Sequence, residues 1–173
     1  MRVSLTPHPE TLWPPVHRID VEIQRRGDRL WLKYMLSGDT ARVRWPSPAP
    51  AERTDGLWAH TCFEAFIKGD AGYHEFNLSI SGQWASYSFD GYREGMTPAD
   101  EEVVLESLEG RGTYTDIGGL FDLPAGANRL ALSAVIEDVE GGLSYWAFVH
   151  PSGKPDFHHP DSFALVIPPP EPA

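Results

Sequence analysis

The chain has 173 residues, 41% of them hydrophobic and 12% aromatic, which is enough to build one domain around its own core. Its 14 lysines and arginines stand against 25 aspartates and glutamates, so the net charge is -11. A charge of this sign repels nucleic acid phosphates and anionic membrane surfaces, and neither is an expected partner.

Short segments with alternating apolar side chains follow one another along the chain, and most are bounded by Gly, Pro, Asn or Asp. Within residues 30–36 and 129–137 the apolar positions recur with period two, as they do in strands. Glycine turns at Gly27 and at Gly141 and Gly142 predict two antiparallel hairpins. We expect ten strands, at residues 16–26, 30–37, 57–68, 73–81, 83–89, 103–109, 113–120, 129–138, 143–150 and 162–167.

Such a series of short strands predicts an all-β fold, an antiparallel two-sheet β-sandwich of the jelly-roll type, in a single domain over residues 1–167. Two proline-rich stretches fall outside the strands, because proline lacks the N–H group that a central ladder needs. Residues 45–50 should form a long surface loop, and residues 168–173 a flexible tail.

The three strands predicted over residues 57–89 gather polar and aromatic side chains on one face. Side chains alternate along a strand, so Phe63, Phe76 and Leu78 should face the core. The opposite row then carries Trp58, His60, Cys62, Glu64 and Phe66 from the first strand, with Glu75, Asn77 and Trp84 from the next two. Rings stack on sugars or flat ligands, and carboxylates and amides bond hydroxyl groups, so this row is a candidate binding site. The alternative is an ordinary solvated sheet face.

Four segments of this region resemble the DOMON-like superfamily, in the branch similar to family 9 carbohydrate-binding modules: Trp58, Phe63-Glu64-Ala65-Phe66-Ile67, Tyr73-His74-Glu75-Phe76-Asn77 and Ser81-Gly82-Gln83-Trp84. The resemblance covers residues 57–96 and implies a β-sandwich that binds a sugar without turnover or, in other branches, haem. It implies that Trp58 stacks on the ligand and that Glu64 bonds its hydroxyl groups. Trp146, on a late strand whose same face carries His150, is the candidate for a second stacking ring.

A histidine-rich segment near the C-terminal end leaves a metal site open as an alternative. It contains His150, His158, His159 and Asp161, whose imidazole and carboxylate groups suit zinc or iron. The side chains of neighbouring His158 and His159 diverge on an extended chain, which favours instead a loop that bonds its own backbone or borders the ligand site.

Two further functions use residues of the candidate face. Met96 with a histidine would suit haem as an axial pair. Glu64 with Glu75 would suit a glycoside-acting enzyme, which needs two carboxyl groups roughly 5–9.5 Å apart.

Cys62 is the only cysteine, so an internal disulfide and a Cys-based metal cluster are excluded. In an apolar strand it should be a small buried hydrophobe, with catalysis beside His60 as the alternative. The chain begins without the charged and apolar regions of a signal peptide, and no stretch approaches the roughly 18 apolar residues that a membrane span needs. We therefore expect a cytoplasmic protein that binds a small carbohydrate or a similar polar ligand.

Overall fold

A computed structural model describes residues 1–111 and 113–170, so residues 171–173 of the expected tail lie outside the described residues. The described chain is built from antiparallel strands, and the all-β prediction is confirmed. Its strands are β1 (Arg2–Pro7), β2 (Val16–Arg26), β3 (Arg29–Gly38), β4 (Cys62–Lys68), β5 (Tyr73–Leu78), β6 (Trp84–Phe89), β7 (Thr97–Pro98), β8 (Val103–Arg111), β9 (Tyr114–Asp122), β10 (Arg129–Glu137), β11 (Leu143–Ala147) and β12 (Leu165–Val166). Its 3-10 helices are η1 (Thr40–Arg42), η2 (Leu57–Ala59) and η3 (Pro160–Ser162). Nowhere in the described chain does a helix combine the length and the apolar character that crossing a bilayer requires.

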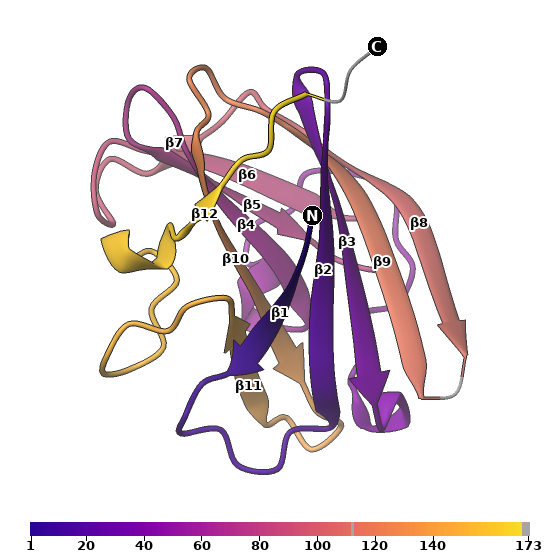
Figure 1. Cartoon of the computed structure of the whole chain (residues 1–173). Helices are drawn as coiled ribbons and strands as arrows, with labels where there is room; N and C mark the ends of the chain where they lie inside the picture. Colours follow the sequence, from indigo (N-terminus) through magenta and orange to yellow (C-terminus); the bar gives the residue numbers. More distant parts are fainter. Residues whose placement is uncertain (112, 171–173) are drawn as a thin grey trace.

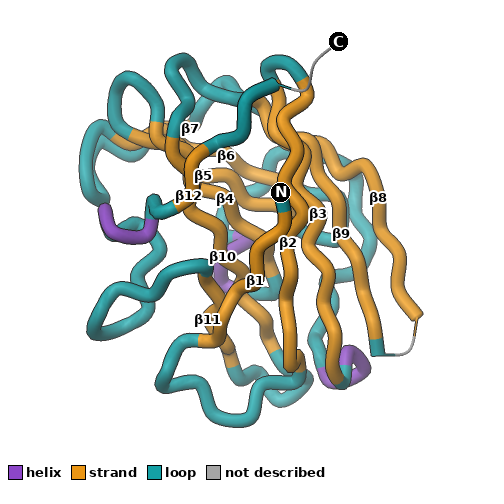
Figure 2. The backbone as a smooth tube through the Cα atoms, in the orientation of Figure 1, coloured by secondary structure: helices purple, strands orange, loops and turns teal. Residues whose placement is uncertain are grey.

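The strands form one continuous sheet in the order β7-β6-β5-β4-β10-β11-β1-β2-β3-β9-β8, with β12 paired to β10 off this path (Figure 1). Strand β1 makes the sheet continuous: Arg2 to Leu5 pair with β2, and Thr6 and Pro7 pair with β11. Two separate sheets were expected, but the hydrogen-bonded path runs from one half to the other through β1. The sheet curls on itself into a half-barrel, as the backbone trace shows (Figure 2).

Two halves of the sheet enclose the main core. Half-sheet A consists of β1, β2, β3, β9 and β8, and half-sheet B of β7, β6, β5, β4, β10, β11 and β12. Across the core, the ring of Phe76 on β5 lies edge-on to Phe121 on β9, with centroids 5.9 Å apart. Gly119 on β9 permits this close approach, because a Cβ atom there would lie 2.5 Å from Leu78 Cδ2. The predicted core residues Phe63, Phe76 and Leu78 are all fully buried between the halves, which confirms the alternation on β4 and β5.

The largest differences from the predicted strands lie at two places. The strand expected from residue 57 begins only at Cys62, because Gly56 adopts a left-handed conformation with φ 79° and the chain turns through η2. Strand β1 was not predicted, since Val3 and Leu5 are its only apolar pair. The hairpins at Gly27 and at Gly141 and Gly142 are confirmed.

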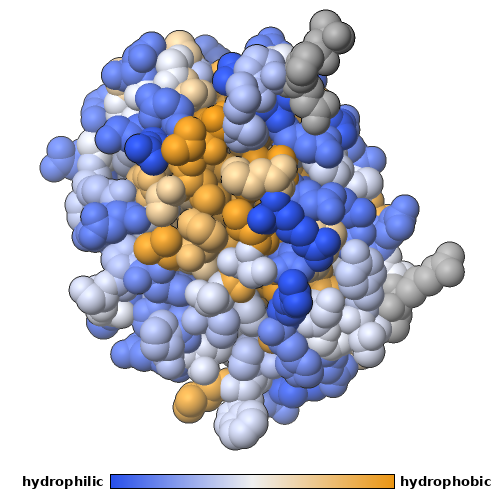
Figure 3. All heavy atoms as spheres, viewed as in Figure 1, coloured by the Kyte–Doolittle hydropathy of each residue, from blue (hydrophilic) through white to orange (hydrophobic). Residues whose placement is uncertain are grey.

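The outer face of half-sheet B carries a second apolar cluster. Phe66, Tyr73, Tyr87 and Phe89 form its centre, and Leu57, Phe157 and Phe163 pack against them from η2 and the segment after β11. On another side of the molecule, apolar side chains gather near the centre of the surface, over β10 and β12 (Figure 3). Turn η2 and the segment after β11 both contribute residues to the lining of a cleft on the outer face of half-sheet B.

Candidate ligand-binding site

Two carboxyl groups lie on the outer face of half-sheet B. Phe63 of β4 points into the core, so Glu64, the next residue, points outward. Its partners across the ladders are Asn77 on β5 and Ser133 on β10. Glu75 precedes Asn77 by two positions and shares its face. Diagonal neighbours on one face of an antiparallel pair lie roughly 7–8 Å apart, which brings both carboxyl groups into one site.

Hydrogen bonds hold the two carboxyl groups in place. The Ser133 hydroxyl donates to Glu64 Oε2 at 3.0 Å, and Asn77 Nδ2 donates to Glu75 Oε1 at 2.9 Å. From half-sheet A, the fully buried Tyr34 hydroxyl crosses the core and donates to the backbone carbonyl of Glu64 at 2.7 Å. The position of Glu64 is therefore fixed from both sides of the sheet.

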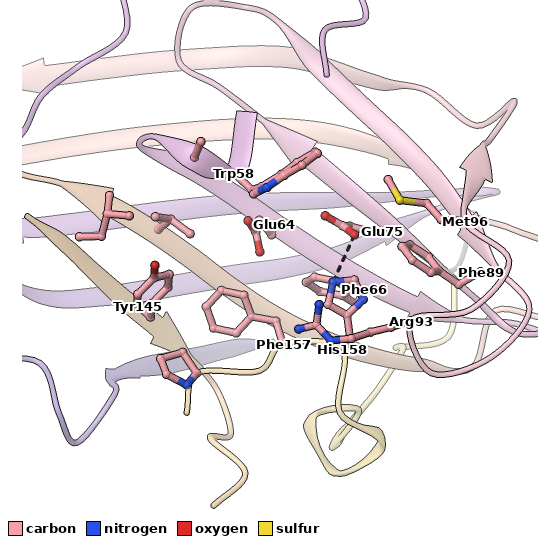
Figure 4. Close-up of a pocket in the computed structure, with 14 residues that line it drawn as sticks. Trp58, Glu64, Phe66, Glu75, Phe89, Arg93, Met96, Tyr145, Phe157 and His158 are labelled. Atoms are coloured by element: carbon pink, nitrogen blue, oxygen red, sulfur yellow. Dashed lines mark ion pairs between the residues drawn. The ribbon is translucent and has the colours of Figure 1, made fainter. Parts of the chain in front are cut away.

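Above the carboxyl groups lies a cleft of about 470 Å³ (Figure 4). Trp58 of η2 and Phe157 of the segment after β11 border it, and the two glutamates project into it. A cleft of this volume with apolar rings and few polar groups is typical of small-molecule sites. The lining consists of Trp58, Ala59, Glu64, Phe66, Glu75, Phe89, Arg93, Met96, Val135, Leu143, Tyr145, Pro155, Phe157 and His158.

Burial governs the charge of the two glutamates. Removal from water, followed by the nearby charge of Glu75, raises the pKa of Glu64 from 4.5 to about 8. Burial also raises the pKa of Glu75, while the hydrogen bond from Asn77 and the charge of Arg93 lower it. Glu64 therefore keeps its proton at neutral pH and presents a carboxylic acid to the cleft.

A chain of polar contacts connects Glu75 to the rim of the cleft. The Tyr73 hydroxyl accepts from the backbone N–H of Arg93 at 3.3 Å and lies 2.8 Å from Nδ1 of His158. The other ring nitrogen of His158, Nε2, faces Glu75 Oε2 at 3.5 Å. Burial and the charge of Arg93 lower the pKa of His158 to about 4, so the imidazole is neutral at neutral pH.

His60 lies apart from this cleft, in a neighbouring one of about 450 Å³. Its Nδ1 is 2.7 Å from Oε2 of Glu137, and Oε1 of the same carboxyl group forms an ion pair with Arg44 at 3.5 Å. The expectation that Trp58 and His60 continue the row of Glu64 assumed a strand where η2 turns the chain. Trp58 nevertheless reaches the same cleft as Glu64, with 42% of its surface exposed, whereas His60 does not.

The expected positions of three other candidates are wrong. Trp84 pairs with Leu78 and therefore faces the core side, where the Arg53 guanidinium lies 4.7 Å above its ring. Trp146 is 1% exposed in the main core and donates through Nε1 to Ser144. The imidazole of His150 lies 2.8 Å from the Thr6 carbonyl, away from the cleft lining. None of these three borders the cleft of Glu64.

The side chains predicted as possible metal ligands do not point toward a common site. His158 lines the cleft, but His159 pairs with Asp161 at 3.7 Å, and the Asp161 side chain is 78% exposed. Within residues 1–111 and 113–170, no group of three or more His, Cys, Asp or Glu side chains is arranged to hold a metal ion.

Cys62 is fully buried, and burial together with the charge of Glu64 raises the pKa of its thiol. The folded protein should therefore react with an aromatic disulfide reagent far more slowly than the urea-unfolded chain, because little thiolate forms and access is blocked. Release of the coloured thiol, followed in both states, measures the difference. Rapid reaction of the folded protein would restore a reactive role for Cys62.

Several site residues were missed in the sequence. Ser133 and Val135 lie on β10, at the positions that alternate with its core residues. The sequence predicted this strand but did not predict that it pairs with β4. Phe157 and Arg93 come from loops, whose positions depend on tertiary packing and leave no periodic signal.

The chain matches no protein-family model, and a search of the curated proteins finds no similar sequence.

Proposed function

We propose that the cleft binds a small carbohydrate or a similar polar ligand without turnover. One observation carries this proposal: aromatic rings of Trp58, Tyr145 and Phe157 border the same cleft as two buried carboxyl groups. A pyranose has an apolar C–H face and a polar rim, so rings and hydrogen-bonding groups are both needed to bind it.

The protonation state of Glu64 suits a ligand with hydroxyl groups. Glu64, with a pKa of about 8, is protonated at neutral pH and both donates and accepts. A sugar hydroxyl also does both, so each can satisfy the other. The resemblance of residues 57–96 to DOMON-like carbohydrate-binding modules supports the same proposal, and with it a fold related to the β-sandwich of those modules.

Trp58→Ala should weaken sugar binding by about 0.5–1.5 kcal/mol, the range of an aromatic stacking contact. The thermal midpoint should change little, because the ring is 42% exposed and its neighbour Tyr87 lies edge-on at 6.0 Å. Isothermal titration with a panel of mono- and disaccharides, together with thermal unfolding, measures both quantities.

Trp13→Ala is the matched control, since Trp13 is 88% exposed and does not line the cleft. Its affinity for every sugar should equal that of the unmodified protein. A Trp58→Ala protein with a much lower midpoint and unchanged affinity would make Trp58 a structural residue. Absence of binding to any sugar at millimolar concentration would reject the proposal.

A glycoside-acting enzyme is a second candidate, favoured by the raised pKa of Glu64. A carboxylic acid that is protonated near neutral pH suits a general acid, and Glu75 would be its partner. Product release from aryl glycosides that disappears in Glu64→Gln would establish this function in place of simple binding.

The contacts of His158 argue against haem as the ligand of the cleft. Met96 and His158 line the same cleft, but Tyr73 and Glu75 occupy both ring nitrogens of the histidine. In this arrangement the residues do not fit a Met and His axial pair. A Soret band in the absorption spectrum of the purified protein would overturn this conclusion.

A further inference from the structure

Among the described residues, no Lys or Arg side chain pairs directly with the two carboxyl groups of the cleft. The one basic side chain in contact with either is His158, whose Nε2 lies 3.5 Å from Glu75 Oε2, and that imidazole is neutral at neutral pH. Arg93 also lines the cleft and its charge favours the ionised form of Glu75, but its guanidinium pairs at 2.8 Å with the carboxylate of Asp156 and not with either glutamate. The floor of the cleft is therefore negative whenever Glu64 and Glu75 both ionise.

Each carboxyl group also keeps an oxygen that the protein does not use fully. Ser133 and Asn77 donate to Glu64 Oε2 and Glu75 Oε1, and no described residue donates to Glu64 Oε1. Glu64 is 2% exposed and Glu75 6%, so little water reaches them. A buried ionised carboxylate is unfavourable unless a cation also pairs with it, and a cationic donor in the cleft would supply that charge.

The walls of the cleft add a second attraction for positive charge. Trp58, Tyr145 and Phe157 contribute aromatic rings to the lining. The faces of such rings attract ammonium groups through their quadrupoles, most strongly where water is excluded. Carboxylates below and rings at the sides together form a site with the chemistry of an ammonium pocket.

We propose that the cleft selects ligands with a protonated primary amine and, among sugars, the amino sugars. The ammonium group would lie between Glu64 and Glu75 with its three N–H donors on their oxygens, whereas a hydroxyl at the same place has only one donor. This inference rests on the proposed function, whose ligand class it narrows. Binding shifts Glu64 toward its ionised form, so a proton leaves the site as the amine enters.

Titration calorimetry at pH 6.5 with glucosamine, glucose, N-acetylglucosamine and cyclohexylamine tests the inference. Glucosamine should bind at least about tenfold more tightly than the two neutral sugars. Its affinity should fall several-fold between about 0.02 and 0.5 M NaCl, whereas that of glucose should not change. Buffers with different ionisation enthalpies should reveal release of up to about one proton with glucosamine and none with glucose.

Glu64→Gln isolates the charge, because glutamine has the shape of a protonated glutamate but cannot ionise. Glucosamine should lose both its affinity advantage over glucose and its proton release in this variant. Glu137→Gln is the matched control, since Glu137 is a buried carboxyl group on the same sheet face that lines the neighbouring cleft. It should leave the preference for glucosamine intact.

The outcomes separate the inference from the proposed function. Equal affinity for glucosamine and glucose would overturn amine selection and leave carbohydrate binding standing. Binding of cyclohexylamine without any sugar would uphold amine selection and overturn the carbohydrate class. Absence of binding by all four probes would overturn both.

Discussion

Replacing Phe76 with alanine should lower the free energy of unfolding by about 3–5 kcal/mol. The ring is fully buried between the two half-sheets and packs edge-on against Phe121 at 5.9 Å. Removing it leaves a cavity at the place where Gly119 lets β9 approach Leu78, and the backbone there has little freedom to collapse into it. Urea unfolding followed by tryptophan fluorescence measures the change.

Phe76→Leu is the control for this prediction. It keeps most of the apolar volume, and such exchanges usually change the free energy of unfolding by less than about 1.5 kcal/mol. The same ranking should hold for Phe63, which packs against Tyr34 with ring centroids 5.1 Å apart. A loss below about 1 kcal/mol for both alanine variants would place the main core on the other face of half-sheet B.

The faces of the inner strands followed from period-two alternation. Phe63 and Phe76 alternate with Glu64 and Glu75, and the structure places the first pair in the core and the second on the outer face. Burial of one sheet face fixes which residues point inward, because shifting the strand by one residue would expose every apolar side chain. The carboxyl floor of the site could therefore be predicted from the sequence.

The walls of the site could not be predicted in the same way. Trp58 belongs to a 3-10 turn that starts after Gly56, so counting by two from Glu64 reaches a residue outside the strand. Trp84 was assigned to the wrong face because the turn at Gly82 sets its pairing with Leu78. Turn geometry fixes the register of the strand that follows, and no periodic signal within that strand reveals it.

The remaining residues in the walls of the cleft are brought there by packing between segments far apart in the sequence. Phe157 approaches Phe66 at 6.4 Å although 91 positions separate them in the sequence (157 minus 66). Trp146 shows the opposite case: its pairing with Ala134 on β10 turns the ring into the core, so a tryptophan that was a candidate for stacking on ligand serves packing instead.

Glu64→Gln should make the stability of the protein depend on pH in a different way from that of the unmodified protein. Burial raises the pKa of Glu64 from 4.5 to about 8. Between these pH values the folded protein holds a proton that the unfolded chain has released, so the free energy of unfolding falls as the pH rises, by about 1.4 kcal/mol per pH unit. Glutamine has no proton to release and removes this loss. The variant should equal the unmodified protein near pH 4 and exceed it by several kcal/mol above pH 8.

The titration of His158 changes the free energy of unfolding in the opposite direction, so its effect must be separated from that of Glu64. Its pKa is lowered from 6.5 to about 4, so the unfolded chain binds the extra proton and stability rises with pH between these values. From about pH 4.5 to 6.5 the two contributions oppose each other in the unmodified protein, whose stability should then fall from pH 6.5 to 8. In Glu64→Gln the rise from His158 should remain, opposed by the loss that the raised pKa of Glu75 contributes.

Asp20→Asn provides the control, because its carboxyl group is shifted in the other direction. Hydrogen bonds from Ser4, Arg2 and Arg18 outweigh desolvation and lower the pKa of Asp20 to about 2. The ionised Asp20 carboxylate contributes its full share of the free energy of unfolding above the usual pKa of 3.8, and this share is lost only as the pH falls toward 2. Asp20→Asn should therefore be less stable than the unmodified protein by a constant amount from pH 5 to 9. Urea unfolding of the three proteins over this range compares the curves. Parallel curves for Glu64→Gln and the unmodified protein would mean that Glu64 is ionised at neutral pH, and the cleft would then hold a permanent carboxylate in place of an acid.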